Sequence, residues 1–231
     1  MAGPSAIRSS RGKPPREPAA PSVPDELSVP GDPAAVGDEA SYVAVLLADL
    51  DLSGRSCTSS ELDQCRCRSV DLSRAALRRV TVTDTTFERC DLANMRARDC
   101  SLRRVSVHAS RMTGLACLDG RLRDVSFTEC QIDLASFRAS RFTDVLFSGC
   151  RLRQADFGDA DLSGARFENC DLTGASFNGA KMTGTRLRGC ELAGLSGVTS
   201  LRGAILTSAD AVALALTLAG ALGIRVEDDD P

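Results

Sequence analysis

The sequence between Ala155 and Gly174 reads ADFGD-ADLSG-ARFEN-CDLTG, four blocks of five residues. In each block the first residue is small and the third is Leu or Phe. The pattern continues without insertion or deletion from Ser60 to Leu192, where all 27 third positions are apolar and hold all eight Phe residues of the chain. A fixed period of this kind indicates a chain built of repeated structural units.

The distribution of charge shows which positions face the interior. The first and third positions of the repeat supply 54 of the 133 residues between Ser60 and Leu192, yet they contain none of the 39 charged side chains in this stretch. Charged residues are almost never fully buried without a partner, so these two positions point inward and the other three point to water. Neither a helix nor a flat strand repeats every five residues, and the backbone must therefore turn regularly.

The blocks Ala160-Asp161-Leu162-Ser163-Gly164 and Cys170-Asp171-Leu172-Thr173-Gly174 match the A-(D/N)-L-x-x consensus of the pentapeptide-repeat proteins. The chain resembles this family over roughly residues 50–195. The resemblance implies an all-β solenoid, a right-handed quadrilateral β-helix with four pentapeptides in each square coil. Residues 20 apart then stack at about 4.8 Å, giving about seven coils. Gly at the fifth position is expected at the corners, where φ is positive.

The segments outside the repeat set the domain boundaries. Residues 1–40 hold eight of the nine Pro and few large apolar side chains, which predicts a disordered tail. Residues 41–200 are expected to form the β-helix, in which 41–50, interpreted as out of register, form an N-terminal cap. Residues 201–226 are expected to form a helical cap and 227–231 an acidic tail. No secretory signal or membrane span is recognised, which favours a cytoplasmic protein.

The predicted helix covers residues 209–222, with Ser208 as N-cap and Gly223 just after its end. Its large apolar side chains spread over too wide an arc for contact with one surface. One side can cover the end of the solenoid, and the other can contact a second copy. Members of the family that the chain resembles dimerise through a C-terminal end. We therefore expect a homodimer whose interface contains Leu214, Leu218 and Leu222, with Val212 and Leu216 turned toward the last coil.

All ten Cys occupy first or third positions and are expected to be buried, reduced thiols. Stacked thiols such as Cys150 and Cys170 would be close enough for a disulfide. Cys65-x-Cys67 resembles part of a metal site, but the only His, His108, is at an outward position. No nucleophile with an adjacent base, phosphate loop or cofactor motif is visible. The sequence thus predicts a non-enzymatic scaffold without metal or cofactor, which binds a macromolecular partner through its flat faces.

Charge distinguishes between two kinds of partner. Residues 42–197 carry 22 Lys and Arg against 20 Asp and Glu. Stacking by 20 gathers ten arginines into a basic shoulder: Arg78, Arg79, Arg96, Arg98, Arg103, Arg104, Arg121, Arg123, Arg138 and Arg141. This favours an acidic protein partner of unknown identity. The alternative comes from family members that imitate duplex DNA, bind DNA gyrase or topoisomerase, and modulate it or protect it from quinolones. That mode requires a dense negative surface.

Overall fold

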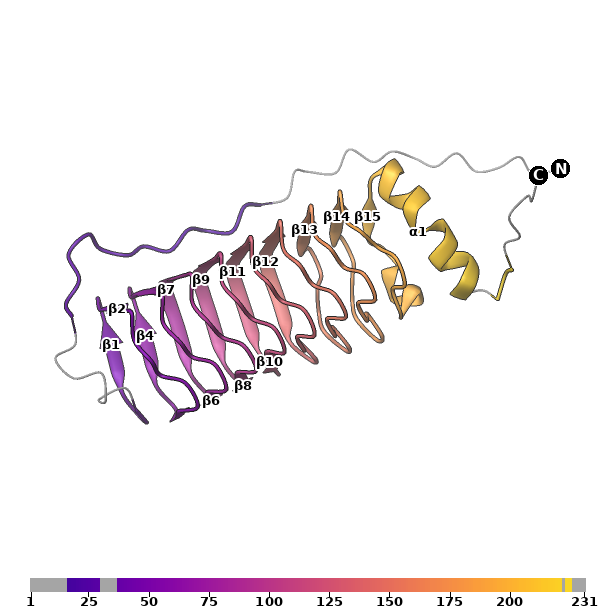
Figure 1. The fold of residues 1–231 in the computed structure, drawn as a ribbon. Helices are drawn as coiled ribbons and strands as arrows, with labels where there is room; N and C mark the ends of the chain where they lie inside the picture. Colours follow the sequence, from indigo (N-terminus) through magenta and orange to yellow (C-terminus); the bar gives the residue numbers. More distant parts are fainter. Residues whose placement is uncertain (1–15, 30–36, 222, 226–231) are drawn as a thin grey trace.

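The computed structural model describes residues 16–29, 37–221 and 223–225. From Ser41 onward the chain winds into a β-solenoid of about eight coils, closed by one C-terminal helix (Figure 1). Strand β11 (Arg121–Thr128) pairs in parallel with β9 (Ser101–His108) and β12 (Arg141–Ser148), and every residue lies opposite the one 20 positions away. The predicted quadrilateral β-helix with a capping helix is confirmed.

Two parallel sheets run along the solenoid. The larger contains β1 (Ser41–Val43), β2 (Leu46–Ala48), β4 (Glu61–Asp63), β5 (Arg66–Arg68), β7 (Thr81–Glu88), β9, β11, β12, β13 (Arg166–Glu168), β14 (Arg186–Arg188) and β15 (Ile205–Leu206). The smaller contains β3 (Ser56–Thr58), β6 (Ala76–Arg78), β8 (Arg96–Arg98) and β10 (Ala116–Leu118). Single bridges such as Gln131↔Arg151 join the coils elsewhere.

The first coil begins earlier than the sequence interpretation placed it. Tyr42 lies opposite Leu62 and Leu47 lies opposite Cys67, so both residues occupy third positions of the repeat in register. The interpretation of residues 41–50 as out of register is therefore wrong. They form the first half of an additional coil, which brings the total to about eight instead of the seven expected, because their apolar side chains continue the inward columns of the next coil.

Every corner uses left-handed backbone at the fifth position of the repeat. Gly164 and Gly194 have φ of 79° and 66°, as predicted. The same conformation occurs at 23 non-glycine residues, among them Asp84 (φ 45°) and Asp124 (φ 54°), and all of them are fifth positions. The coil geometry therefore imposes a positive φ whatever the side chain, although only Gly adopts it without steric cost.

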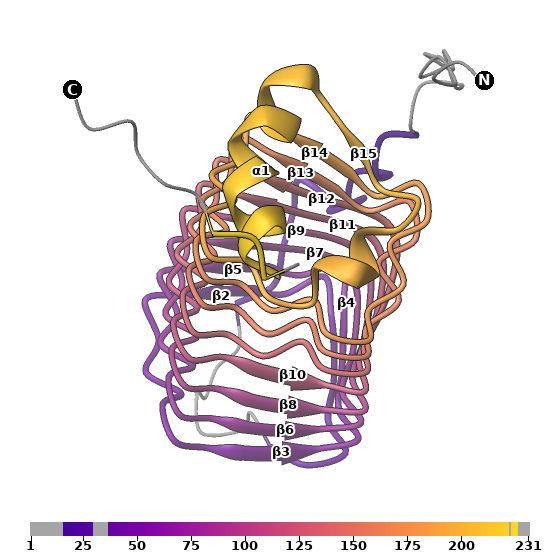
Figure 2. The ribbon, with the colours of Figure 1, turned by 90° about the vertical axis from the view of Figure 1, so that its right-hand side faces the viewer.

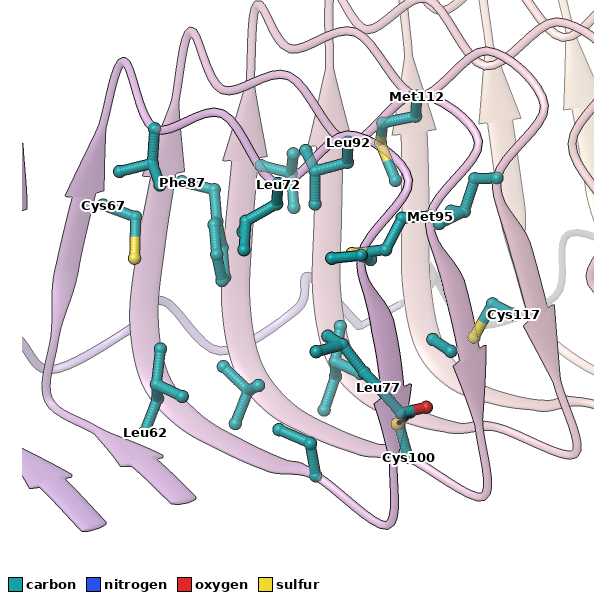
Figure 3. Close-up of a pocket in the computed structure, with 18 of the residues that line it drawn as sticks. Leu62, Cys67, Leu72, Leu77, Phe87, Leu92, Met95, Cys100, Met112 and Cys117 are labelled. Carbon is teal, nitrogen blue, oxygen red and sulfur yellow. Dashed lines mark hydrogen bonds between the residues drawn. The ribbon is translucent and has the colours of Figure 1, made fainter. Parts of the chain in front are cut away.

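Two ladders of stacked rings fill the C-terminal half. Phe147 lies between Phe127 and Phe167, with ring centroids 4.8 and 4.9 Å away and nearly parallel planes. A second ladder contains Phe137, Phe157 and Phe177. In the N-terminal half Leu, Val, Cys and Ala replace most of these rings and leave an apolar cavity of about 130 Å³ (Figure 3). The interior is thus tightly packed at one end and underfilled at the other.

We expect Val107→Phe to raise the free energy of unfolding. Val107 lines the cavity and stacks between Phe87 and Phe127, so a ring there would complete the ladder. Filling such a space typically adds about 0.5–2 kcal/mol. Val105→Phe is the matched control, because Val105 at a first position is buried but does not line the cavity, and overpacking costs roughly 1–3 kcal/mol. Urea unfolding measures both variants, and a loss of stability in Val107→Phe would show that the cavity cannot accommodate a ring.

The last coil is one residue shorter than the others. Ser196 still lies opposite Ser176, but in β15 Ile205 lies opposite Arg186, an offset of 19. The change of register follows Gly197, whose left-handed backbone precedes the short 3-10 helix Val198–Leu201 (η2). Helix α1 (Ser208–Ala221) then crosses the open end of the solenoid (Figure 2). Its bounds are within one residue of the predicted 209–222.

Residues 16–29, here called the strap, run along one corner of the solenoid (Figure 1). Ser28 forms a bridge with Val45 in the first coil, and Glu17 contacts Arg166 near the other end. This defined path differs from the disordered tail expected over 1–40, because Asp and Arg side chains of the corner hold the strap in place of apolar burial. Residues 1–15, 30–36 and 226–231, including the predicted acidic tail, lie outside the described residues.

Candidate functional site: an arginine-rich face

The ten arginines of the predicted basic shoulder lie on two adjacent faces of the solenoid, and nine of them are exposed. One face carries β6, β8 and β10, and the other carries the first halves of β9, β11 and β12. Parallel pairing stacks Arg78 on Arg98, Arg103 on Arg123, and Arg121 on Arg141. The register predicted from the repeat is thus correct for these side chains.

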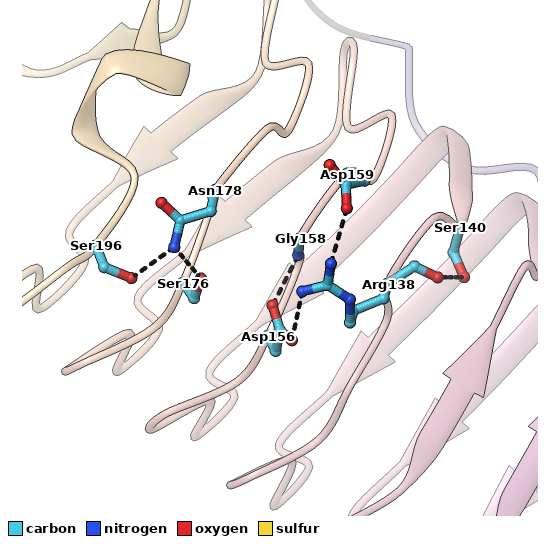
Figure 4. Close-up of polar contacts among 8 residues, drawn as sticks. All are labelled: Arg138, Ser140, Asp156, Gly158, Asp159, Ser176, Asn178 and Ser196. Atoms are coloured by element: carbon cyan, nitrogen blue, oxygen red, sulfur yellow. Dashed lines mark hydrogen bonds and ion pairs between the residues drawn. The ribbon is translucent and has the colours of Figure 1, made fainter.

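Two of the ten arginines are neutralised by neighbouring carboxylates. Arg104 is half-buried and forms an ion pair with Asp84, and the hydrogen bond from Arg104 lowers the pKa of that carboxyl. Arg138 bridges two coils, with nitrogen atoms 3.2 Å from Asp156 and 2.8 Å from Asp159 (Figure 4). These two side chains link coils and contribute little positive charge to the surface.

Three further arginines have a looser carboxylate neighbour. The nearest N–O distances are 3.6 Å for Arg98 to Asp119 and 3.7 Å for Arg123 to Asp124. Arg141 lies 4.0 Å from Asp161. Exposed pairs such as Arg98 with Asp119 contribute about 0–1 kcal/mol and are screened by salt. Arg123 lies beyond hydrogen-bond distance of the buried Asp124, and all three guanidinium groups are themselves exposed and can still contact a partner.

The remaining five arginines have no carboxylate within ion-pair distance in the described part of the chain; we call them the arginine face: Arg78, Arg79, Arg96, Arg103 and Arg121. Arg79 donates a hydrogen bond to Ser59 at 3.3 Å. The face has the chemistry to bind carboxylates or phosphates, because each guanidinium offers a planar fork of donors.

The thiols are structural, as the sequence indicated. Nine Cys are buried, Cys57 is partly buried, and all ten are free. Thiols at first positions donate to a carbonyl of the preceding coil, as in Cys150 to Phe127 O at 3.4 Å. Burial raises the pKa of Cys117 to about 12, which disfavours the reactive thiolate. No cluster able to hold a metal ion occurs among the residues that the structure describes.

The rotation of α1 differs from the prediction. Leu214, expected at a dimer interface, is buried against the last coil, whereas Val212 and Leu216 are 75% and 68% exposed. Leu218 is 37% exposed, and Leu222 lies outside the described residues. The reason is that apolar residues occur on every side of this helix, so the pattern alone did not fix which side meets the solenoid.

Asp210 closes the C-terminal end of the solenoid, a role that sequence reasoning missed. Its Oδ1 accepts a hydrogen bond from Cys190 N at 3.0 Å, and its Oδ2 accepts one from Gly189 N at 3.2 Å. In earlier coils the side-chain hydroxyl of the residue 20 positions later accepts the equivalent hydrogen bond. An example is the bond from Cys90 N to Ser110 Oγ. Thr207, rather than the predicted Ser208, caps the helix by accepting from Asp210 N. The sequence signal that could have indicated this role is that Asp210 is the single charged residue of the helix.

Comparison with sequence families identifies the class of protein. The model for the pentapeptide repeat region matches residues 120–196, and the model for pentapeptide repeats (8 copies) matches residues 65–104. The chain belongs to the pentapeptide-repeat family. No curated protein sequence matches it.

Solved structures of similar fold belong to the same family. HetL, a pentapeptide repeat protein involved in heterocyst differentiation regulation from Nostoc sp. strain PCC 7120, is 20% identical, with 74% of this chain and 91% of HetL covered and a TM-score of 0.32. A trypsin-treated form of QnrB1, a plasmid-mediated fluoroquinolone resistance protein, is 21% identical, with 81% and 100% covered and a TM-score of 0.34. These likenesses concern the fold alone.

Helix α1 is too short to cross a membrane, and the described residues contain no other helix that could do so.

Proposed function

We propose that this chain is a non-enzymatic cytoplasmic scaffold that binds an acidic protein partner through the arginine face. The observation that carries the proposal is the set of exposed guanidinium groups without carboxylate partners, gathered on two adjacent flat faces. Each fork can bind a carboxylate through two hydrogen bonds. Because the strands are rigidly paired, the spacing between these forks is fixed before a partner arrives.

The surface differs in charge from one that imitates duplex DNA. Arg103 and Arg121 project from the middle of the solenoid, where a DNA mimic requires acidic side chains. We therefore place a gyrase-binding DNA mimic second, as the alternative that an enzymatic assay must separate from our proposal.

The double variant Arg103→Glu/Arg121→Glu should no longer capture the partner protein in cross-linking experiments in the native cell. Both side chains are exposed and lack a carboxylate partner in the described chain, so the fold should be unaffected. The matched control is Arg89→Glu with Arg188→Glu, which makes the same change of net charge on a different face. If both double variants lose capture equally, net charge alone explains the effect. Binding through the arginine face is then contradicted.

The alternative function has its own measurement. We expect purified protein to leave the supercoiling activity of DNA gyrase unchanged at tens of micromolar, with or without a quinolone. Inhibition or protection that survives Arg103→Glu with Arg121→Glu would favour the DNA mimic over the proposed scaffold.

We also propose a homodimer through the outer side of α1. Val212 and Leu216 of α1 expose large apolar side chains one turn apart. An isologous contact would bury the same patch twice. Val212→Glu with Leu216→Glu should give a soluble monomer in light scattering, because unpaired carboxylates in an apolar contact are costly. A wild-type chain that is already monomeric at tens of micromolar would contradict this assembly.

A further inference from the structure

The strap carries a proline at every third residue: Pro18, Pro21 and Pro24. Two of the residues that follow a proline donate their backbone N–H to the corner of the solenoid. Ala19 N lies 3.0 Å from Asp124 Oδ1, and Ser22 N lies 3.0 Å from Asp84 Oδ1. The corner therefore contacts the backbone of the strap at two points, three residues apart.

The period of the strap matches the period of the solenoid. A polyproline II helix has three residues per turn and rises 3.1 Å per residue, or about 9.3 Å per turn. Asp84 and Asp124 are two coils apart, a distance of about 9.6 Å at the spacing of paired strands. One turn of an extended proline-rich chain thus carries the next N–H to the next acceptor.

An ion pair fixes the position of the strap along the corner. The carboxylate of Glu17 accepts two hydrogen bonds from Arg166, at 2.5 and 2.6 Å. The side chain of Arg166 is only 4% exposed, and the hydrogen bonds from it lower the pKa of Glu17. A paired fork of this type gives both strength and geometric specificity. The glutamate precedes the two donating amides by two and five residues.

The acceptors are built into the corner. The side chains of Asp84 and Asp124 are 8% and 7% exposed, and both residues occupy left-handed fifth positions where Gly would be free of strain. Arg104 lies between them in the same column and holds Asp84 in place. Because the two hydrogen bonds use backbone amides, positions 19 and 22 require an N–H and therefore exclude Pro. The corner thus fits the pattern Glu-Pro-x-x-Pro-x.

We propose that this corner is a binding site for an extended proline-rich segment of a partner protein with that pattern, and that the strap is the competitor supplied by the chain itself. Polyproline II segments suit such exchange, because they are preformed and lose little entropy on binding. The exposed Glu17 holds the strap through its ion pair with Arg166, and Arg16 adds two looser pairs, 3.5 Å from Asp124 and 3.5 Å from Asp144. A few backbone hydrogen bonds complete the attachment. The site borders the arginine face, since Arg123 next to Asp124 stacks on Arg103, but it binds through different side chains.

A labelled synthetic peptide of residues Arg16–Val29 tests the site by fluorescence anisotropy on the full chain. We expect the wild-type chain to resist the peptide, because its own strap acts at an effective concentration of about millimolar. The variant Glu17→Arg releases the strap, since two guanidinium groups would then face each other at Arg166. This variant should bind the native peptide at least about tenfold more tightly than the wild-type chain does.

Specificity is tested by reversal of charge and by two matched peptides. The variant Arg166→Glu should bind a peptide with Glu17→Arg and reject the native one. A peptide with Ala19→Pro loses the N–H donated to Asp124 and should bind at least about tenfold more weakly. Ala20→Pro keeps both donors at an exposed position and should bind as the native peptide does.

Four results would overturn the proposal. One is that neither Glu17→Arg nor the wild-type chain binds the native peptide; another is that both bind it equally. The third is equal binding of the Ala19→Pro and Ala20→Pro peptides, which would exclude the amide contacts. If wild-type and Glu17→Arg chains form a mixed complex larger than either alone, the occupant is the strap of a second copy, and a partner protein is the wrong assignment. Capture through the arginine face is measured independently of all these results.

Discussion

Replacement of Phe147 by Ala should lower the free energy of unfolding by roughly 3–5 kcal/mol, the range measured when a buried Phe is truncated. Phe147 has no exposed surface, and its ring stacks on two others at 4.8 and 4.9 Å. The second ladder also contacts it, with the rings of Phe137 and Phe157 each 6.2 Å away. The rigid, paired strands cannot collapse into the space, so the full cavity remains.

Urea unfolding of Phe147→Ala should be compared with that of Thr143→Ala in the same strand. Thr143 is exposed at an outward position, where substitutions usually change stability by no more than about 0.5 kcal/mol. A loss below about 1 kcal/mol for Phe147→Ala would mean that the ring column does not stabilise the solenoid.

Gly197→Ala should also be strongly destabilising, by about 3 kcal/mol or more. A Cβ at Gly197 would lie 2.4 Å from Asn178 N and 2.6 Å from the carbonyl carbon of Phe177, both backbone atoms of the neighbouring coil. This close approach occurs where the register of the last coil changes. To relieve the contact, residue 197 must either move away from the preceding coil or leave its left-handed conformation. The position of α1 depends on both features.

Gly164→Ala is the matched control for this effect. Gly164 has a similar left-handed φ of 79°, but nothing lies within 4 Å of the added Cβ. Its substitution should cost only the backbone strain, about 1–2 kcal/mol. Comparable losses for the two variants would show that the strain alone, and not the contact with Asn178, explains the requirement for Gly at 197.

Much of the fold could be predicted because the inward positions of the repeat exclude charge. The five-residue period fixed the parallel register, the ladders around Phe147 and the burial of the thiols. The ion pairs of Arg104 and Arg138 were not predicted. The 20-residue register predicts the face and the coil on which a side chain lies. It does not predict toward which carboxylate a long arginine side chain turns.

The strap and the rotation of α1 could not be read from the sequence, for different reasons. The strap buries little apolar surface, and its partners Asp124 and Arg166 lie more than 100 residues away, so the proline content indicated only disorder. In α1, the choice between Leu214 and Leu216 for the buried side depends on the shape of the last coil. Tyr42 and Leu47, by contrast, were in phase and could have been assigned to the first coil.

The strap also changes how this protein should fold and unravel. In an ordinary solenoid each coil contacts only its neighbours, so unfolding can begin at an end and proceed coil by coil. Here Ser28 is bonded to the first coil while Glu17 is bonded to Arg166, about six coils further on. During synthesis the strap is made first, yet it can dock only after the coil of Arg166 has formed. Its docking therefore joins coils that are not neighbours into one cooperative unit, and does so as a late step of folding.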